Sequence, residues 1–74
     1  MKIRVLNKLG DTLLTDEPIT GDRVKNMSTA EVNQEFDTMI REGYVGIDDD
    51  TDTIIHRLDK KTQNVTMLFP LQGG

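Results

Sequence analysis

One segment in the middle of the chain has the pattern of an amphipathic helix, and it limits the fold more than any other feature. Ser28 is a good N-cap, and Glu31 three residues later completes a capping box. Gly43 is placed to end the helix in the left-handed conformation. A single helix with one apolar stripe needs a sheet to cover, so the sequence predicts an α+β domain. The stripe has the spacing i, i+4, i+7 and i+8 and consists of Val32, Phe36, Met39 and Ile40.

The segments on either side of this helix have the alternation and composition of β-strands. Residues 1–6 have a strand pattern, in which Met1, Ile3 and Val5 alternate with the basic Lys2 and Arg4. A turn near Gly10 leads to a return strand at 12–15. Residues 17–26 contain a loop and show no regular pattern. The predicted element order is ββαβββ, with one mixed sheet packed on one helix. The last three strands are predicted over 44–47, 53–58 and 64–69.

The composition excludes several classes of function. The chain has 74 residues, no cysteine and a net charge of −4. A domain of this size has no room for a large internal substrate pocket, and without cysteine it forms neither a disulfide nor a thiolate intermediate. The acidic balance argues against a nucleic-acid surface, and no run resembles a signal peptide or a membrane span. We therefore expect a cytoplasmic protein, monomeric when free, that binds neither nucleic acid nor membrane, needs no cofactor and is not an enzyme.

Two other features invite a chemical interpretation. Asp48, Asp50 and Asp52 have the spacing of the first three ligands of an EF-hand loop. Thr53 stands where that loop needs glycine, so an acidic hairpin turn is favoured over a calcium site. His56 is the only histidine, and neither a metal site nor a general base finds its further partners in the sequence. The sequence therefore predicts no catalytic residue and no metal ligand.

The chain finishes in Gly73-Gly74, shortly after a predicted strand and a proline. Terminal glycines stabilise no structure, because glycine loses more conformational entropy on ordering than any other residue. They suit a carboxylate that enters a narrow active site on another protein as bare backbone. We expect residues 1–70 to form the domain and residues 71–74 to form a flexible tail.

The run Leu68-Phe69-Pro70, followed by two residues and Gly73-Gly74, resembles the endings of the small sulfur-carrier proteins. These include the small subunit of molybdopterin synthase, the thiamine-biosynthesis carrier and the archaeal small modifiers. The predicted element order is similar to the β-grasp fold of ubiquitin-like proteins. A β-grasp places its last strand between the first and third strands. Because 54–58 and 64–69 also read as a direct hairpin, a ββαβββ meander stays open.

The resemblance implies a definite chemistry at the C-terminus. An activating enzyme would adenylate the Gly74 carboxylate with ATP, because AMP is a far better leaving group than oxide. Capture by sulfur would then give a thiocarboxylate, or a thioester to an enzyme cysteine. The implied partners are an adenylating activating enzyme, conjugation targets or a sulfur-accepting synthase, and a deconjugating protease. The acyl-transfer terminus would be Gly73 and Gly74, and the docking segment would be Leu68, Phe69, Pro70, Leu71 and Gln72.

The competing interpretation belongs to a different class of protein. The chain is then a non-covalent β-grasp binding or adaptor module, and its terminal glycines are incidental. Deleting Gly73-Gly74 distinguishes the two, because only the carrier needs the terminal carboxylate.

Overall fold

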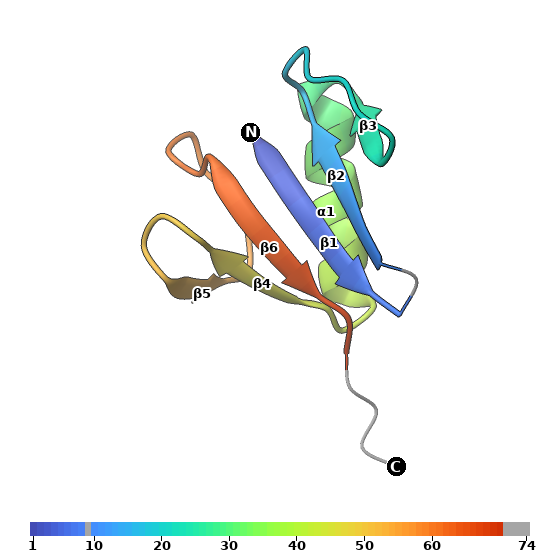
Figure 1. Ribbon diagram of the computed structural model, residues 1–74. Coiled ribbons are helices and arrows are strands. Elements are labelled where there is room, and N and C mark those ends of the chain that lie inside the picture. Colours follow the sequence, from blue (N-terminus) through green and yellow to red (C-terminus); the bar gives the residue numbers. More distant parts are fainter. Residues whose placement is uncertain (9, 71–74) are drawn as a thin grey trace.

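The fold consists of a mixed sheet with a helix across one face (Figure 1). The computed structural model describes residues 1–8 and 10–70. Within these residues the sheet has six strands in the order β3-β2-β1-β6-β4-β5. The predicted α+β class, with one mixed sheet packed on a helix, is therefore confirmed. Along the chain the elements are β1 (Lys2–Asn7), β2 (Gly10–Thr15), β3 (Val24–Asn26), α1 (Thr29–Arg41), β4 (Val45–Asp48), β5 (Thr53–Ile55) and β6 (Asn64–Leu68).

The predicted order ββαβββ is not confirmed, because a third strand precedes the helix. β3 pairs in parallel with β2, with Val24 opposite Leu13 and Asn26 opposite Thr15. The Leu13 N–H donates to the Arg23 carbonyl at 2.8 Å. This strand has three residues and no buried side chain. Backbone hydrogen bonds rather than apolar alternation hold it, so the sequence pattern contains no sign of it.

The last strand lies inside the sheet rather than at its edge. β6 pairs in parallel with β1 and antiparallel with β4. The alternative of a direct hairpin between 54–58 and 64–69 is wrong, since β5 is antiparallel to β4 and ends at Ile55. Burial explains the difference: Val65 and Met67 are almost completely buried, whereas Ile54 is 64% exposed and suits an edge strand. The strand order is compatible with a β-grasp.

The core lies between the sheet and α1. The capping box at the start of the helix is confirmed, since the Ser28 side chain accepts the Glu31 N–H and the Glu31 carboxylate accepts the Ser28 N–H, each at 3.1 Å. Phe36 is fully buried, and a Cβ built on Gly46 of β4 would lie 3.2 Å from its ring. Gly46 therefore lets the helix approach the sheet closely. The buried apolar side chains are Ile3, Val5, Leu14, Val32, Phe36, Met39, Val65 and Met67.

Candidate functional site

The candidate site is the place where the chain leaves the sheet after β6. The Phe69 N–H donates to the Leu6 carbonyl oxygen at 3.1 Å, so backbone pairing with β1 continues one residue past the strand. Pro70 follows, half-buried, with a fixed φ and no N–H of its own. Val45, the first residue of β4, pairs with Leu68, so the start of β4 lies beside this exit (Figure 1). The exit is therefore bounded by the end of β1 and the start of β4.

Two aromatic side chains pack against each other at the same exit. The rings of Tyr44 and Phe69 meet edge to face, with centroids 5.4 Å apart and planes 80° apart. Such a pair contributes about 0.5–1.5 kcal/mol beyond the burial of its surface. Tyr44 is half-buried and packs against the core, whereas Phe69 remains 41% exposed. The Phe69 ring is thus supported on one side and open to solvent on the other.

The C-terminal end of α1 fixes the backbone of Tyr44. The Gly43 N–H donates to the Ile40 carbonyl at 3.1 Å, and the Tyr44 N–H donates to the Met39 carbonyl at 3.0 Å. These are the two hydrogen bonds of a Schellman motif. Gly43 has a φ of +95°, which confirms the left-handed conformation predicted for it. The helix end and the exit of the chain are therefore joined through Tyr44.

The outer face of the sheet, which points away from α1, is apolar next to this exit. Leu68 lies opposite Leu6 on one side and opposite Val45 on the other. Since side chains alternate along a strand and Met67 faces the core, Leu68 faces outward. Val45 is 40% exposed. We call Leu6, Leu68 and Val45 the outer row.

The structure brings together three of the residues that the sequence assigned to docking. Leu68, Phe69 and Pro70 lie at the exit, where Leu68 belongs to the outer row and Phe69 to the aromatic pair. The other four predicted positions lie outside the described residues: Leu71, Gln72, Gly73 and Gly74.

Sequence reasoning missed Tyr44. A usable signal was present, because the residue after a helix-ending glycine is commonly tied back to the last turn of that helix. The local pattern instead presents Tyr44 as the first residue of a strand, which hides its contact with Phe69.

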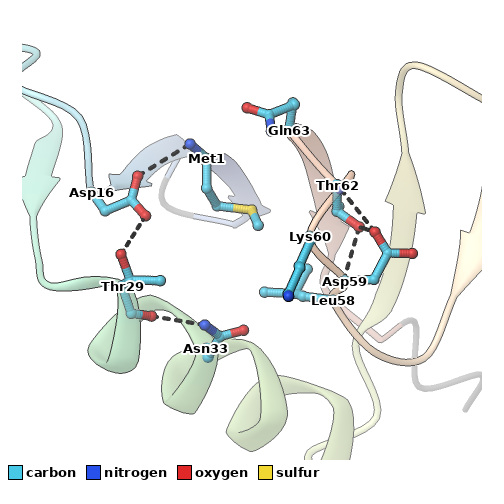
Figure 2. A pocket seen from close by; sticks show the side chains of 9 residues that line it. All are labelled: Met1, Asp16, Thr29, Asn33, Leu58, Asp59, Lys60, Thr62 and Gln63. Atoms are coloured by element: carbon cyan, nitrogen blue, oxygen red, sulfur yellow. Dashed lines mark hydrogen bonds and ion pairs between the residues drawn. The ribbon is translucent and has the colours of Figure 1, made fainter.

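A cavity of about 390 Å³ lies near the starts of β1 and β6, away from the exit (Figure 2). Asp16 accepts hydrogen bonds from the Met1 ammonium at 3.1 Å and from the Thr29 hydroxyl at 2.9 Å. The Asn33 amide donates to the Thr29 carbonyl at 2.9 Å. These contacts join the start of the chain to the first turns of α1. The lining residues are Met1, Asp16, Thr29, Asn33, Leu58, Asp59, Lys60, Thr62 and Gln63.

Hydrogen bonds shift the pKa values of the charged groups beside this cavity. The Thr29 hydroxyl, and then the Met1 ammonium, lower the pKa of Asp16. Burial alone would lower the pKa of the Met1 ammonium, but hydrogen bonds to Glu17 and Asp16 outweigh it and the pKa is raised. Both shifts favour the charged forms that attract each other. The charged groups of Met1 and Asp16 are therefore engaged with each other at the edge of this cavity.

The acidic turn and the histidine show no convergent site. Asp48 accepts the Asp50 N–H at 2.9 Å, while the Asp50 carboxylate accepts the Asn64 amide at 3.2 Å. These carboxylates therefore serve separate partners, in keeping with a hairpin turn. No group of three His, Cys, Asp or Glu side chains gathers as a metal site within residues 1–8 and 10–70. His56 is exposed. The strand predicted over 53–58 ends at Ile55, so His56 lies just outside it.

Comparisons with protein families, with curated proteins and with solved structures gave no match to this chain. Over the part of the chain that the structure describes, no helix has the length and apolarity needed to cross a membrane. A function for this chain is therefore inferred from the geometry of the exit and from the residues that follow it in the sequence.

Proposed function

We propose that this chain is a cytoplasmic ubiquitin-like protein of the β-grasp type that acts as a protein modifier or a sulfur carrier through Gly74. It serves as a substrate of enzymes rather than as an enzyme. Its partners are an adenylating activating enzyme, the acceptor of its sulfur or acyl group, and a deconjugating protease.

The position of β6 is the observation that carries this proposal. When the short β3 is set aside, the strand order is β2-β1-β6-β4-β5. The last strand then lies between the first strand and the first strand after the helix, which is the pairing that distinguishes a β-grasp from a meander. α1 covers one face of this sheet (Figure 1). The direct hairpin, which would have departed from a β-grasp, is replaced by the pairing of β6 with β4.

The way the chain leaves the sheet gives further support. A carrier must hold its folded part firmly and offer its terminus to another protein. Here the Phe69 N–H is bonded to Leu6 and the Phe69 ring rests on Tyr44. Four residues follow Pro70 in the sequence and end in Gly73-Gly74. At about 3.3–3.6 Å per extended residue, four residues span at most roughly 13–14 Å, which would be enough to enter the active site of a partner.

The chemistry needs no reactive side chain from this protein. A Gly74 carboxylate oxygen attacks the α-phosphorus of ATP, and pyrophosphate leaves to give an acyl adenylate. A thiol of the activating enzyme then attacks the carbonyl carbon, expels AMP and releases its proton, which gives a thioester. Attack by a sulfide equivalent instead gives the thiocarboxylate. A chain without cysteine cannot capture its own activated terminus through a thiol.

The direct test is the intact mass of the protein recovered from its own host under thiol-protected, non-reducing conditions. Sulfur carriage predicts a species in which one oxygen is replaced by sulfur, and protein modification predicts isopeptide conjugates through Gly74. The matched control is the chain that lacks Gly73 and Gly74, which should fold normally and form neither product. An unmodified mass alone, in growing cells with ample ATP, would reject the proposal.

A second candidate function is supported by the outer face of the sheet. Val45 and Ile54 are large apolar side chains on this face that remain 40% and 64% exposed. Such side chains on one protein are typical of a surface that binds another protein. A non-covalent adaptor module would use this face and would keep its partner after deletion of Gly73 and Gly74. The same deletion therefore separates the two functions.

A further inference from the structure

We propose, on the basis of the function proposed above, that Tyr44 is a positioning residue for the chemistry at Gly74. Tyr44 and Phe69 form an aromatic clasp that fixes the direction in which the chain leaves the domain. Tyr44 takes no part in the acyl transfer itself. It acts through Phe69, and its role is to fix for the activating enzyme the direction in which the chain leaves the domain at Phe69 and Pro70.

Tyr44 is held both at its backbone and at its side chain. Its N–H is bonded to the Met39 carbonyl at 3.0 Å as part of the Schellman motif, and its side chain packs against the core. The ring therefore has little freedom to follow Phe69 if the chain moves. Tyr44 is therefore the fixed partner of the clasp, and Phe69 packs against it.

Two successive residues at the exit, Phe69 and Pro70, contact the end of α1. Phe69 places its ring edge to face on Tyr44. Pro70 lies over Gly43, since a Cβ built on that glycine would be 3.7 Å from the Pro70 Cβ. On the other side, Leu6 accepts the Phe69 N–H. The chain is thus held from both β1 and the end of α1 at the point where it leaves the sheet.

The clasp should affect how readily the activating enzyme binds this protein. Phe69 and Pro70 are already oriented in the free protein, so they lose less conformational freedom when a partner binds them. The clasp should therefore lower the concentration of this protein at which the activating enzyme reaches half of its maximal rate. It should leave unchanged the rate of chemistry once the terminus is bound. This division separates a positioning residue from a catalytic one.

Two substitutions of Tyr44 isolate the contribution of the ring. Tyr44→Phe keeps the edge-to-face contact, whereas Tyr44→Leu keeps apolar bulk but removes the ring. The Phe69 amide reports on the clasp, because it donates to the Leu6 carbonyl from the same residue whose ring contacts Tyr44. From the usual strength of an aromatic pair, Tyr44→Leu should speed hydrogen exchange of the Phe69 amide about two- to tenfold relative to the Met67 amide in the core. Tyr44→Phe should leave that ratio unchanged, and an unchanged ratio in Tyr44→Leu would overturn the clasp.

The consequence for Gly74 is tested in the native host, with each variant replacing the wild-type protein. Tyr44→Leu should lower the fraction recovered as thiocarboxylate or conjugate about two- to tenfold, and overexpression should restore it. Tyr44→Phe should match the wild type. Equal fractions in Tyr44→Leu and wild type, or a loss that overexpression does not restore, would overturn the positioning role. Absence of both products in the wild type would instead reject the proposed function, and the exchange experiment would still decide whether the clasp exists.

Discussion

Gly46 should be one of the least replaceable residues of the domain, because α1 approaches β4 at this point. An added Cβ would lie 3.2 Å from the Phe36 ring, 3.2 Å from the Met67 sulfur and 3.2 Å from the Ile55 carbonyl oxygen. Each distance is shorter than ordinary van der Waals contact. Both side chains are fully buried, so they have little room to move away.

The expected cost of Gly46→Ala follows from two opposing effects. Overpacking of a well-packed core costs about 1–3 kcal/mol. Alanine recovers about 0.5–1 kcal/mol, because it loses less backbone entropy than glycine in a strand. The net loss of unfolding free energy is therefore about 0–2.5 kcal/mol, with its centre near 1 kcal/mol. A chain of this size is stable by only about 4–11 kcal/mol, so the variant should fold with a clearly lower urea midpoint. At about 1 kcal/mol per molar of urea, a loss near 1 kcal/mol should lower the midpoint by roughly 1 M.

Urea unfolding followed by circular dichroism measures this shift, and a double-mutant cycle tests its cause. Phe36→Leu removes the ring atom nearest to the new methyl group. In that background Gly46→Ala should cost at least about 0.5 kcal/mol less than in the wild type. Glu35→Ala, on the exposed side of α1, serves as a control and should change stability by no more than about 0.5 kcal/mol. A Gly46→Ala midpoint equal to or above that of the wild type would refute the close approach of helix and sheet.

Three further predictions concern the helix ends and the start of the chain. Ser28→Ala should lower the free energy of unfolding by about 1 kcal/mol, because the Glu31 N–H loses its acceptor; an unchanged urea midpoint would contradict the capping box. Gly43→Ala should cost about 1–2 kcal/mol through its positive φ, and Gly43→Asn should cost less, since asparagine tolerates this conformation better; equal costs for both variants would point to another cause. The Met1 ammonium has a raised pKa in the folded state, so its stabilising effect should be complete below its ordinary pKa of 8.0 and should be lost as pH rises through the folded-state pKa. Thermal melts between neutral and alkaline pH should show this decline in the free chain and not in the Nα-acetylated chain, and parallel curves for the two would exclude it.

The local features of the helix could be predicted from sequence because neighbouring residues determine them. The capping box of Ser28 and Glu31 and the left-handed Gly43 are confirmed, and Val32, Phe36 and Met39 are buried as their spacing predicts. The first hairpin is likewise specified by alternation and a turn, with β1 and β2 antiparallel.

The pairing of β6 could not be predicted in this way. Val65 and Met67 show that the strand is buried on one face, but alternation says nothing about which strands flank it. Its partner β1 is separated from it by most of the chain, and loop length alone favoured the nearer β5. β3 was missed for a different reason, because its backbone hydrogen bonds to β2 have no counterpart in the side-chain pattern. The Tyr44–Phe69 contact depends on the pairing of β6, so it could be recognised only when that pairing was known.

The parallel pairing of β1 with β6 determines how the domain resists mechanical force. Lys2 at one end of the interface lies opposite Asn64, and Leu6 at the other end lies opposite Leu68. A force that pulls Lys2 and Pro70 apart therefore acts along both strands, in opposite directions. It loads the hydrogen bonds between them together, in shear, rather than opening them one after another. A machine that unfolds proteins by pulling against these two ends must break this interface in a single step, whereas a pull directed across the sheet can peel an edge strand away.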